Sequence, residues 1–475
     1  MSELKIGTAA VLGVSPEETG RRKFATPNQV LAIVCVGICL ANLDLFIVNV
    51  ALPNIAADFR GASLEDLSWV LNGYAIVYAA LLVFFGRLAE RHSRNSSFLL
   101  GVGLFTVASA ACAFAGNVAV LVAFRMVQAA GAALMTPTSL GLLLASFPPD
   151  RRAHAVRTWT AIGGLAAAFG PLAGGLLVTV DWRWIFLVNV PIGLVAILIG
   201  WRKLPEVPGH DAPRPSFWAA FLVTCGIGAL TLAIVKANDW GWGSAWTMFA
   251  FAAAAVFLAL FTHHCLRSAN PFVDPALFKV RPFTGASLVM APYSAAFGAM
   301  ILSIALWQQN VWGWSALKAG LAIAPGPVMV PVTSLLFAGR LIARFGAGVV
   351  TTAGIFFFVA GLLVWLTTAG AEPSMTAAIG GIALTGIGVG LTFPTLMGVS
   401  AASLPPSSFA TGSGVINMIR QAAMAVGVAI LVAVVGTPSS LNERIAAFHR
   451  GWWIIAGITL LGLIPTYLFI RRTSK

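Results

Sequence analysis

Three ionisable side chains stand inside long apolar stretches of the sequence, and their types suggest proton chemistry. Asp44 lies within LANLDLFIVNVALP, Arg125 within LVAFRMVQAA, and Arg420 within GVINMIRQAAMAVGVAI, where Gln421 follows it. An ionised side chain at the centre of a membrane costs roughly 3 kcal/mol on insertion scales, so residues of this kind are functional candidates by default. Asp44 and Arg125 lie about seven or eight residues from the corresponding ends of their stretches, which at ~1.5 Å per residue places them at similar depth.

A carboxyl group and a guanidinium at one depth can bind and release a proton. Burial favours the protonated form of Asp44, whereas a nearby Arg125 favours the ionised form, and a conformational change that alters this balance completes a proton cycle. The alternative is a static ion pair that joins two helices. Arg420 has no carboxylate partner within the apolar stretches of its half. It could donate to backbone carbonyls, attract an anionic substrate group, or pack against the cytoplasmic vestibule.

The composition indicates that the chain lives in a membrane. Of its 475 residues, 59% are hydrophobic and 9% charged, against roughly 25% charged in a soluble domain. The net charge of +13 is spread over many short segments, so we expect no nucleic-acid partner. The five cysteines show no CxxC spacing and the six histidines lie in loops or at span ends, so no metal site is predicted. Since no ATP-binding loop or intramembrane nucleophile cluster is present, we expect no cofactor beyond a proton gradient and no enzyme activity.

Fourteen stretches are long enough, at about twenty residues, to cross the hydrocarbon layer as helices. No cleaved signal peptide is expected, because a polar tail precedes the first stretch. The predicted spans are 29–52, 67–86, 97–116, 118–146, 153–179, 184–201, 217–236, 245–265, 283–308, 317–338, 348–369, 375–399, 409–436 and 451–470.

Lysine and arginine alternate between the two sides of these spans, which predicts the orientation. The segments on one side hold only Arg60, Arg183, Lys236, Lys318, Arg444 and Arg450. Nearly all the other lysines and arginines lie in segments on the same side as the N-terminus. Because cytoplasmic loops retain basic residues, both termini are predicted in the cytoplasm of a protein of the plasma or inner membrane. Tryptophans that gather at the outer boundary predict an aromatic belt there: Trp182, Trp184, Trp240, Trp242, Trp312, Trp314, Trp452 and Trp453.

An internal repeat divides the chain. GRLAERH from Gly86 matches GRLIARF from Gly339, and GAALMTPTSLGLLLASFPP from Gly131 matches GVGLTFPTLMGVSAASLPP from Gly388. Parallel repeats related by an axis along the membrane normal are a transporter architecture with a substrate site between them; an inert duplicated scaffold is the alternative. We predict an all-α fold arranged 6 + 2 + 6, with a cytoplasmic tail (1–28), a first six-helix half (29–201), a linker with two extra spans (202–282) and a second half (283–475).

Glycine and proline gather in one span, in AFGPLAGGLL, which includes Gly170, Pro171, Gly174 and Gly175. Proline removes a helix hydrogen bond, and glycine allows backbones to approach closely. A bend with tight helix contact is predicted, although small-residue faces also serve simple packing.

Taken together, six motifs in order resemble the major facilitator superfamily, and specifically its fourteen-span drug:proton antiporter branch. They are LDLFIVNVALP with Asp44 and Asn49, SWVLNGYAI with Trp69 and Tyr74, GRLAERHSRN, RMVQAAGAA with Arg125 and Gln128, GPLAGG, and WRWIFLVNVPIG. The chain departs from the usual patterns at Glu90, His92, Ser93, Asn95, Ala129 and Ala166.

The resemblance implies proton-driven export by alternating access, with Asp44 as proton site and Arg125 and Gln128 in proton relay or substrate contact. It assigns Gly86, Arg87, Glu90 and Arg91 to a conformational latch, and Gly170, Pro171, Gly174 and Gly175 to the antiporter motif. The candidate substrate contacts are Asn49, Trp69, Tyr74, Gln128, Arg420 and Gln421. Arg420 and Gln421 belong to none of the six motifs and are candidates because of their place in an apolar stretch.

The charge inventory predicts the substrate class. Asp44 is the only carboxylate deep inside a predicted span, since Asp239, Asp274, Glu372 and Glu443 are expected in loops. We therefore predict lipophilic neutral or monocationic substrates. The alternatives are a proton-coupled transporter of an endogenous metabolite and, more remotely, a membrane sensor or intramembrane enzyme. The expected partners are a small-molecule substrate, protons and the lipid bilayer. We expect a monomer, and accessory export proteins are an optional further partner.

Overall fold

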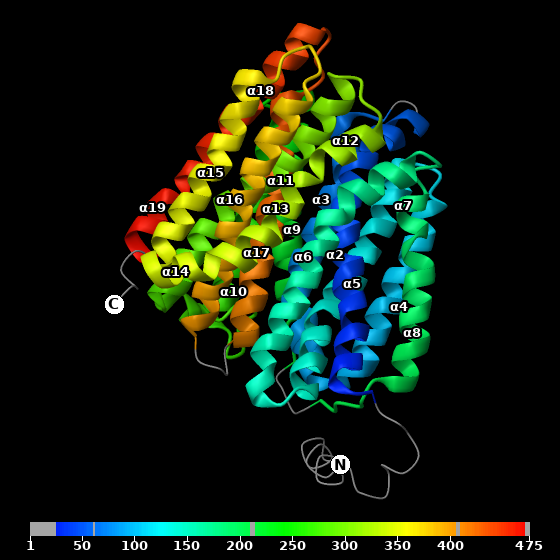
Figure 1. Cartoon of the computed structure of the whole chain (residues 1–475), viewed down its shortest axis with the longest axis vertical. Helices are drawn as coiled ribbons and strands as arrows, with labels where there is room; N and C mark the ends of the chain where they lie inside the picture. The colour runs from blue at the N-terminus through cyan, green and yellow to red at the C-terminus, as the bar shows by residue number, and fades with distance from the viewer. Residues whose placement is uncertain (1–24, 60–61, 210–213, 405–408, 471–475) are drawn as a thin grey trace, which may run out of the picture.

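A computed structural model describes residues 25–59, 62–209, 214–404 and 409–470, and every regular element in these ranges is a helix (Figure 1). The first group comprises α2 (Pro27–Asp58), α3 (Leu64–Arg91), α4 (Arg94–Ala113), α5 (Val118–Ser146), α6 (Pro149–Val178), α7 (Trp184–Leu187) and α8 (Asn189–Lys203). The second comprises α9 (Phe217–Trp240) and α10 (Ala245–Arg267). The third comprises η2 (Pro275–Lys279), α11 (Arg281–Asn310), α12 (Ala316–Ile323), α13 (Pro325–Thr333), η3 (Ser334–Ala338), α14 (Gly339–Phe345), α15 (Ala347–Thr368), α16 (Met375–Ala402), α17 (Phe409–Val435), α18 (Leu441–Leu461), α19 (Leu463–Pro465) and η5 (Thr466–Ile470).

Thirteen helical stretches in the described ranges are long and apolar enough to cross a membrane. The predicted span at 153–179 corresponds to α6, whose apolar stretch, Ile162–Val178, is shorter. Most of the predicted tail, 1–24, lies outside the described residues. Below, the side on which α2 begins is called the N-terminal side and the opposite one the far side.

Polar caps fix where several helices begin. Thr26 and Gln29 form a reciprocal capping box at the start of α2, and Ser63 and Asp66 form another at the start of α3. Such boxes satisfy backbone N–H groups that have no partner inside the helix. The Asn117 side chain caps α5 with a single hydrogen bond, accepting from the Val120 N–H at 2.9 Å.

The helices of the first and third groups form two bodies that lie side by side in Figure 1. Within the first body α2 packs against α6 and α4 against α5, and within the second α15 packs against α16. The two bodies meet where α3 packs against α17 and where α6 packs against α12 and α13.

The pair α9 and α10 packs together at the seam between the bodies. Helix α9 contacts both α3 and α17. At its far end the Lys236 ammonium lies 3.6 Å from the Asp66 carboxylate of α3. The Asn238 amide of α9 donates to the Ala433 carbonyl of α17. One helix of the pair thus holds an element from each body.

Two sequence expectations about boundaries are wrong. Helix α18 begins at Leu441, not near 451, because Ser440 caps it and Glu443 accepts hydrogen bonds from Ser439. Glu443 therefore lies in the first turn of α18, and Arg444 and Arg450 lie further along the same helix. Asp239 lies in the last turn of α9 and not in a loop.

The aromatic belt is also only partly present. Trp184, Trp240, Trp242 and Trp453 are exposed, whereas Trp182, Trp312, Trp314 and Trp452 are buried. Trp452 packs 4.9 Å from the Trp307 ring and donates to the Ser303 hydroxyl at 3.1 Å. These four tryptophans belong to the protein interior because their N–H groups or rings find partners there.

Candidate functional site

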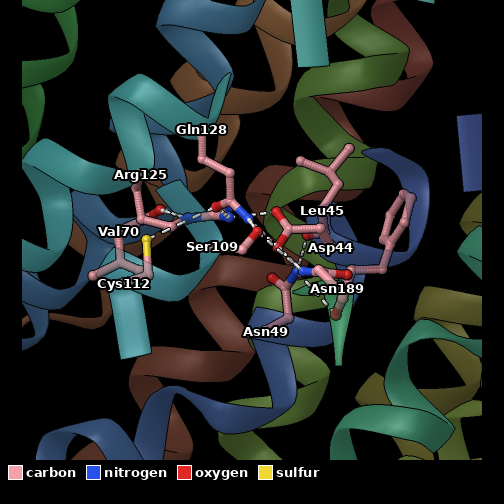
Figure 2. A network of polar contacts seen from close by, with 10 residues as sticks. Asp44, Leu45, Asn49, Val70, Ser109, Cys112, Arg125, Gln128 and Asn189 are labelled. Atoms are coloured by element: carbon pink, nitrogen blue, oxygen red, sulfur yellow. Dashed lines mark hydrogen bonds and ion pairs between the residues drawn. The ribbon is translucent and has the colours of Figure 1, made fainter. Parts of the chain in front are cut away.

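Asp44 of α2 and Arg125 of α5 form an ion pair, and both side chains are completely buried. Figure 2 shows the guanidinium pointing across from α5 to the carboxylate. The two residues that the sequence predicted at equal depth are thus in contact in the fold. Breaking a buried pair by removing one partner leaves an uncompensated charge in a low-dielectric interior, so each of these groups depends on the other.

Three neutral side chains complete the surroundings of the Asp44 carboxylate. The Gln128 amide donates to Asp44 Oδ1 at 2.9 Å, and the Asn189 amide of α8 donates to the same oxygen at 3.3 Å. Gln128 also donates to the Ser109 hydroxyl of α4 at 2.7 Å and accepts from Arg125 at 2.6 Å. Helices α2, α5 and α8 therefore meet at one carboxyl group, and α4 joins them through the bonds of Ser109 to Gln128 and Asn189 (Figure 2).

The other side of the Arg125 guanidinium is covered by α3. Its Nε donates to the Val70 carbonyl at 3.2 Å, and its carbon lies 4.1 Å from the centre of the Tyr74 ring. A cation over an aromatic face is attracted by the negative face of the ring. Of the guanidinium nitrogens, Nη2 is buried without a hydrogen-bond partner. That nitrogen leaves the site two unused N–H groups.

Small residues bring α4 and α5 close enough for Ser109 to reach Gln128. A Cβ atom added to Gly131 would lie 2.6 Å from the Phe105 backbone nitrogen, closer than real Cβ contacts. Ala129 and Ala132 beside it are fully buried. The alanine- and glycine-rich sequence of α5 is therefore what allows this close helix packing.

A cavity of about 30 Å³ lies between the two bodies and is lined by α2, α3, α11 and α17. Asn49 and Asn72 are its polar lining residues, among apolar neighbours that include Phe46 and Met424. Asn49 donates to the Leu45 carbonyl of its own helix, whereas both amide atoms of Asn72 are buried without partners. A cavity of this size holds about one water molecule, so little open space separates the two bodies at this level.

The glycine and proline motif of α6 joins the carboxylate-bearing helix to the second body. A Cβ at Gly174 would lie 2.7 Å from the Ile47 carbonyl oxygen of α2, and one at Gly170 would lie 2.7 Å from Phe46. On another face, a Cβ at Gly175 would lie 2.6 Å from the Ala316 carbonyl oxygen of α12. The predicted tight contact is present, and it extends to both bodies.

The predicted latch residues lie near the end of α3 on the N-terminal side. Gly86 faces Pro137 of α5, and Arg87 is within electrostatic range of Glu90 and of Asp274, which precedes η2. Arg91 lies next to Gly209, since a Cβ on that glycine would meet the Arg91 backbone. These contacts connect α3 to α5 and to the segment before α11, and the latch role stays a prediction.

The remaining candidate residues lie outside the network. Trp69 packs with Ala75 and Ile227 against α9, away from Asp44. Arg420 and Gln421 lie on α17, one turn toward the N-terminal side from Met424. The structure therefore gathers Asp44, Tyr74, Arg125 and Gln128 but separates them from these three.

Sequence reasoning missed Ser109, Cys112 and Asn189. Cys112 lies 4.0 Å from Gln128 Oε1, and Ser109 and Asn189 are completely buried. A serine or cysteine in an alanine-rich helix carries no periodic signal. Asn189 lies within the motif WRWIFLVNVPIG, and its place in that motif was the signal that could have found it.

Comparisons of the sequence and of the fold with known proteins identify the family of this chain. The family model described as Major Facilitator Superfamily matches residues 34–428. The chain is 34% identical over 441 residues to a tetracenomycin C resistance and export protein of Streptomyces glaucescens, covering 92% of this chain and 80% of that protein. It is 32% identical to a methylenomycin A resistance protein of Streptomyces coelicolor, covering 96% and 95%. A riboflavin transporter of Clostridioides difficile is 29% identical, covering 94% and 98%.

Among solved structures, a peptide transporter crystallised with sulfate superposes with a TM-score of 0.68 at 16% identity, covering 93% of this chain and 95% of that one. At this identity the likeness concerns the fold alone.

Proposed function

The chain belongs to the Major Facilitator Superfamily, and from this premise we propose that it exports lipophilic compounds in exchange for protons by alternating access. The observation that carries the proposal is the buried Asp44–Arg125 pair, whose carboxylate is held by Gln128 and Asn189. The resistance and export proteins to which the chain is similar support the direction of transport.

The geometry supplies a route from proton binding to helix movement. Protonation of Asp44 removes one charge of the pair, and Arg125 then retains the Val70 carbonyl, Gln128 and the Tyr74 ring. The next turn of α2 touches α6 at Gly174, and α6 touches α12 at Gly175. A shift of α2 on protonation is therefore passed to the contact between the two bodies. One proton crossing ~100 mV supplies ~2.3 kcal/mol, about a forty-fold concentration ratio.

The substrate class needs one adjustment. Neutral lipophilic compounds remain our proposal. A monocation requires Asp44 as its counter-charge, and in this structure that carboxylate is enclosed and already paired with Arg125. The structure gives the monocationic part of the prediction no support.

We also propose fourteen spans arranged 6 + 2 + 6, with both termini in the cytoplasm of a plasma or inner membrane protein. The contacts of α9 with α3 and α17 support an extra pair inserted at the seam. Labelling single cysteines introduced in each loop with an impermeant reagent tests the count and the orientation. Labelling of both termini from the cytoplasmic face only is expected, and opposite faces for the two ends would contradict the proposal.

Inverted membrane vesicles test the proton coupling. Acidification of the vesicle lumen should drive accumulation of the neutral fluorescent probe phenylnaphthylamine by the wild-type protein. Asp44→Asn should lose this response but still exchange probe down the probe's own gradient. Asp58→Asn is the matched control, since its side chain is 44% exposed on the same helix and pairs with Arg183. Equal proton-driven accumulation by Asp44→Asn would contradict the proposal.

Asp44→Asn leaves Arg125 buried without its partner, at a cost of about 3–5 kcal/mol in stability. The double variant Asp44→Asn with Arg125→Gln removes both charges and separates loss of coupling from loss of folding. It should unfold at a higher temperature than Asp44→Asn and should remain uncoupled.

A proton-coupled transporter of an endogenous metabolite is the second candidate, because one relative is a riboflavin transporter. Cells expressing the wild type and Asp44→Asn separate the two functions when challenged with a panel of toxic lipophilic compounds. Protection by the wild type alone supports export of such compounds. No protection by either, together with altered cellular content of a metabolite, favours the second candidate.

A further inference from the structure

The two arginines inside the helical bundle differ in what neutralises them. Arg125 has a carboxylate, an amide oxygen, a backbone carbonyl and an aromatic ring around it. Arg420 of α17 forms neither a hydrogen bond nor an ion pair with any residue in the described ranges, and its Nε is buried without a partner. The side chain as a whole is only partly buried, so its outer nitrogens reach accessible space.

Aromatic and neutral groups surround Arg420, and none of them offsets its charge. The guanidinium carbon lies 5.9 Å from the centre of the Phe393 ring of α16. Tyr78 of α3 is within electrostatic range of Arg420. The Tyr78 hydroxyl lies 3.1 Å from that of Thr136, which itself donates to the Ala132 carbonyl. Tyr78 therefore donates its hydrogen to Thr136 and remains a neutral neighbour of Arg420.

Arg420 lies next to the cavity between the two bodies. Met424, one helical turn further along α17, lines that cavity and packs with Tyr74 and Tyr78 of the first body. Phe393 contacts Phe297, whose ring is 6.0 Å from that of Phe46 in the cavity wall. Ring contacts through Phe393 and Phe297 thus link Phe46 in the cavity wall to the Arg420 guanidinium. Beside it, the amide oxygen of Gln421 is buried without a partner.

A guanidinium in this position is retained at a cost, because an arginine at membrane depth is unfavourable unless it is paired. Its planar donor group matches carboxylate and sulfonate oxygens in two parallel hydrogen bonds. We propose that Arg420 is a binding residue for the acidic group of amphipathic anions, whose apolar part lies against Phe393 and Met424. This inference rests on the proposed export function and extends its substrates from neutral compounds to lipophilic carboxylates and sulfonates.

Two fluorescent probes with one scaffold test the inference. Anilinonaphthalene sulfonate carries a negative charge, and phenylnaphthylamine is the same ring system without the sulfonate. Binding of each to the purified full-length protein gives a ratio of affinities. Arg420→Gln should lower the ratio of sulfonate to amine affinity by roughly ten- to a hundredfold, the effect of losing a hydrogen bond between charged groups. Arg420→Lys should lower it less, because the charge remains.

Arg340→Gln is the matched control, since Arg340 is exposed on α14 and donates to the Leu336 carbonyl of the preceding turn. It should leave both affinities unchanged. An unchanged ratio in Arg420→Gln would overturn the inference. If Arg420→Gln cannot be purified, competition on the wild type decides: naphthalene carboxylate should displace the sulfonate probe, and the uncharged naphthalene carboxamide should not. Displacement by both to the same extent would also overturn it.

Transport in inverted vesicles distinguishes this inference from the function on which it rests. Proton-driven accumulation of both probes is expected. Accumulation of the amine alone would overturn the anion site and leave the proposed function standing. Accumulation of neither probe would count against the export of lipophilic compounds itself.

Discussion

The guanidinium of Arg125 lies over the ring of Tyr74, with 4.1 Å between its carbon and the ring centre. The Tyr74 ring in turn stacks on the Tyr78 ring, with 5.8 Å between centres and 23° between planes. Tyr78 is within electrostatic range of Arg420. Two aromatic side chains of α3 therefore connect the buried ion pair of the first body with the unpaired cation at the interface.

The ring of Tyr74, and not its hydroxyl, should matter. The hydroxyl is buried without a partner, so Tyr74→Phe removes an unsatisfied polar group and should preserve both stability and proton-driven transport. Tyr74→Ala should lower the free energy of unfolding by about 3–5 kcal/mol and abolish proton-driven transport. Thermal unfolding and vesicle transport of the two variants measure this. Equal transport by Tyr74→Ala and the wild type would show that the cation–ring contact is dispensable.

Gln128 should be as sensitive as the charged residues, because it bonds to both of them. Gln128→Ala removes hydrogen bonds to a carboxylate and a guanidinium, each worth about 1.5–3 kcal/mol. We expect a lower unfolding temperature and a strong loss of proton-driven transport. Gln29→Ala is the control, since that exposed glutamine only caps the start of α2. Transport by Gln128→Ala at the control's level would contradict this role.

Alanine at Gly175 should prevent the far side from closing. The added Cβ would lie 2.6 Å from the Ala316 carbonyl oxygen, and one at Gly320 would lie 2.4 Å from that of Pro171. Real Cβ contacts are not this short, so α6 and α12 must separate. An impermeant thiol reagent added on the far side reports this through a cysteine placed at Asn49, in a background with the five native cysteines replaced by alanine.

Labelling at that reporter should rise strongly in Gly175→Ala and Gly320→Ala, and transport should be lost. Gly164→Ala, on the same helix, is the control because nothing lies within 4 Å of its added Cβ. Similar labelling in all three variants would show that α6 and α12 do not form the far-side closure.

A smaller effect is expected at a second far-side contact. The Gln309 amide of α11 donates to the Val50 carbonyl of α2 at 3.0 Å, across the two bodies. Gln309→Leu removes a hydrogen bond worth about 1 kcal/mol, so the open population should grow about fivefold. The Asn49 cysteine reporter measures this change, and unaltered labelling would mean that the bond does not contribute to closure.

The sequence predicted those site residues that are charged and stand alone within an apolar stretch. A charged residue among alkyl side chains is conspicuous, and the helical rise gave Asp44 and Arg125 equal depth. Ser109 and Cys112 were not predictable in this way, because small polar residues are ordinary in membrane helices. Which tryptophans face lipid was also not readable, since Trp452 and Trp453 are neighbours in sequence on one helix, yet Trp452 is buried and Trp453 is exposed.

Helix ends were predicted less well than helix centres. Hydropathy marks the hydrocarbon-spanning part, whereas α18 extends outward through polar residues to its serine cap. The hydrogen bonds of Glu443 with Ser439 and Ser440 at this helix start are a local signal that hydropathy averages away.

The repeat has an evolutionary meaning in light of these contacts. Its offset of 257 residues, from Gly131 to Gly388, sets Ile382 opposite Arg125 and Thr385 opposite Gln128. Thr385 only donates to the Ile382 carbonyl of its own helix, so the second copy has no counterpart of the charged network in α16. Under the proposed function, the proton-coupling pair therefore has no charged equivalent at these two positions of the second copy. If relatives share this repeat, mutations in the second half can change the cargo and leave the proposed proton site in the first half intact.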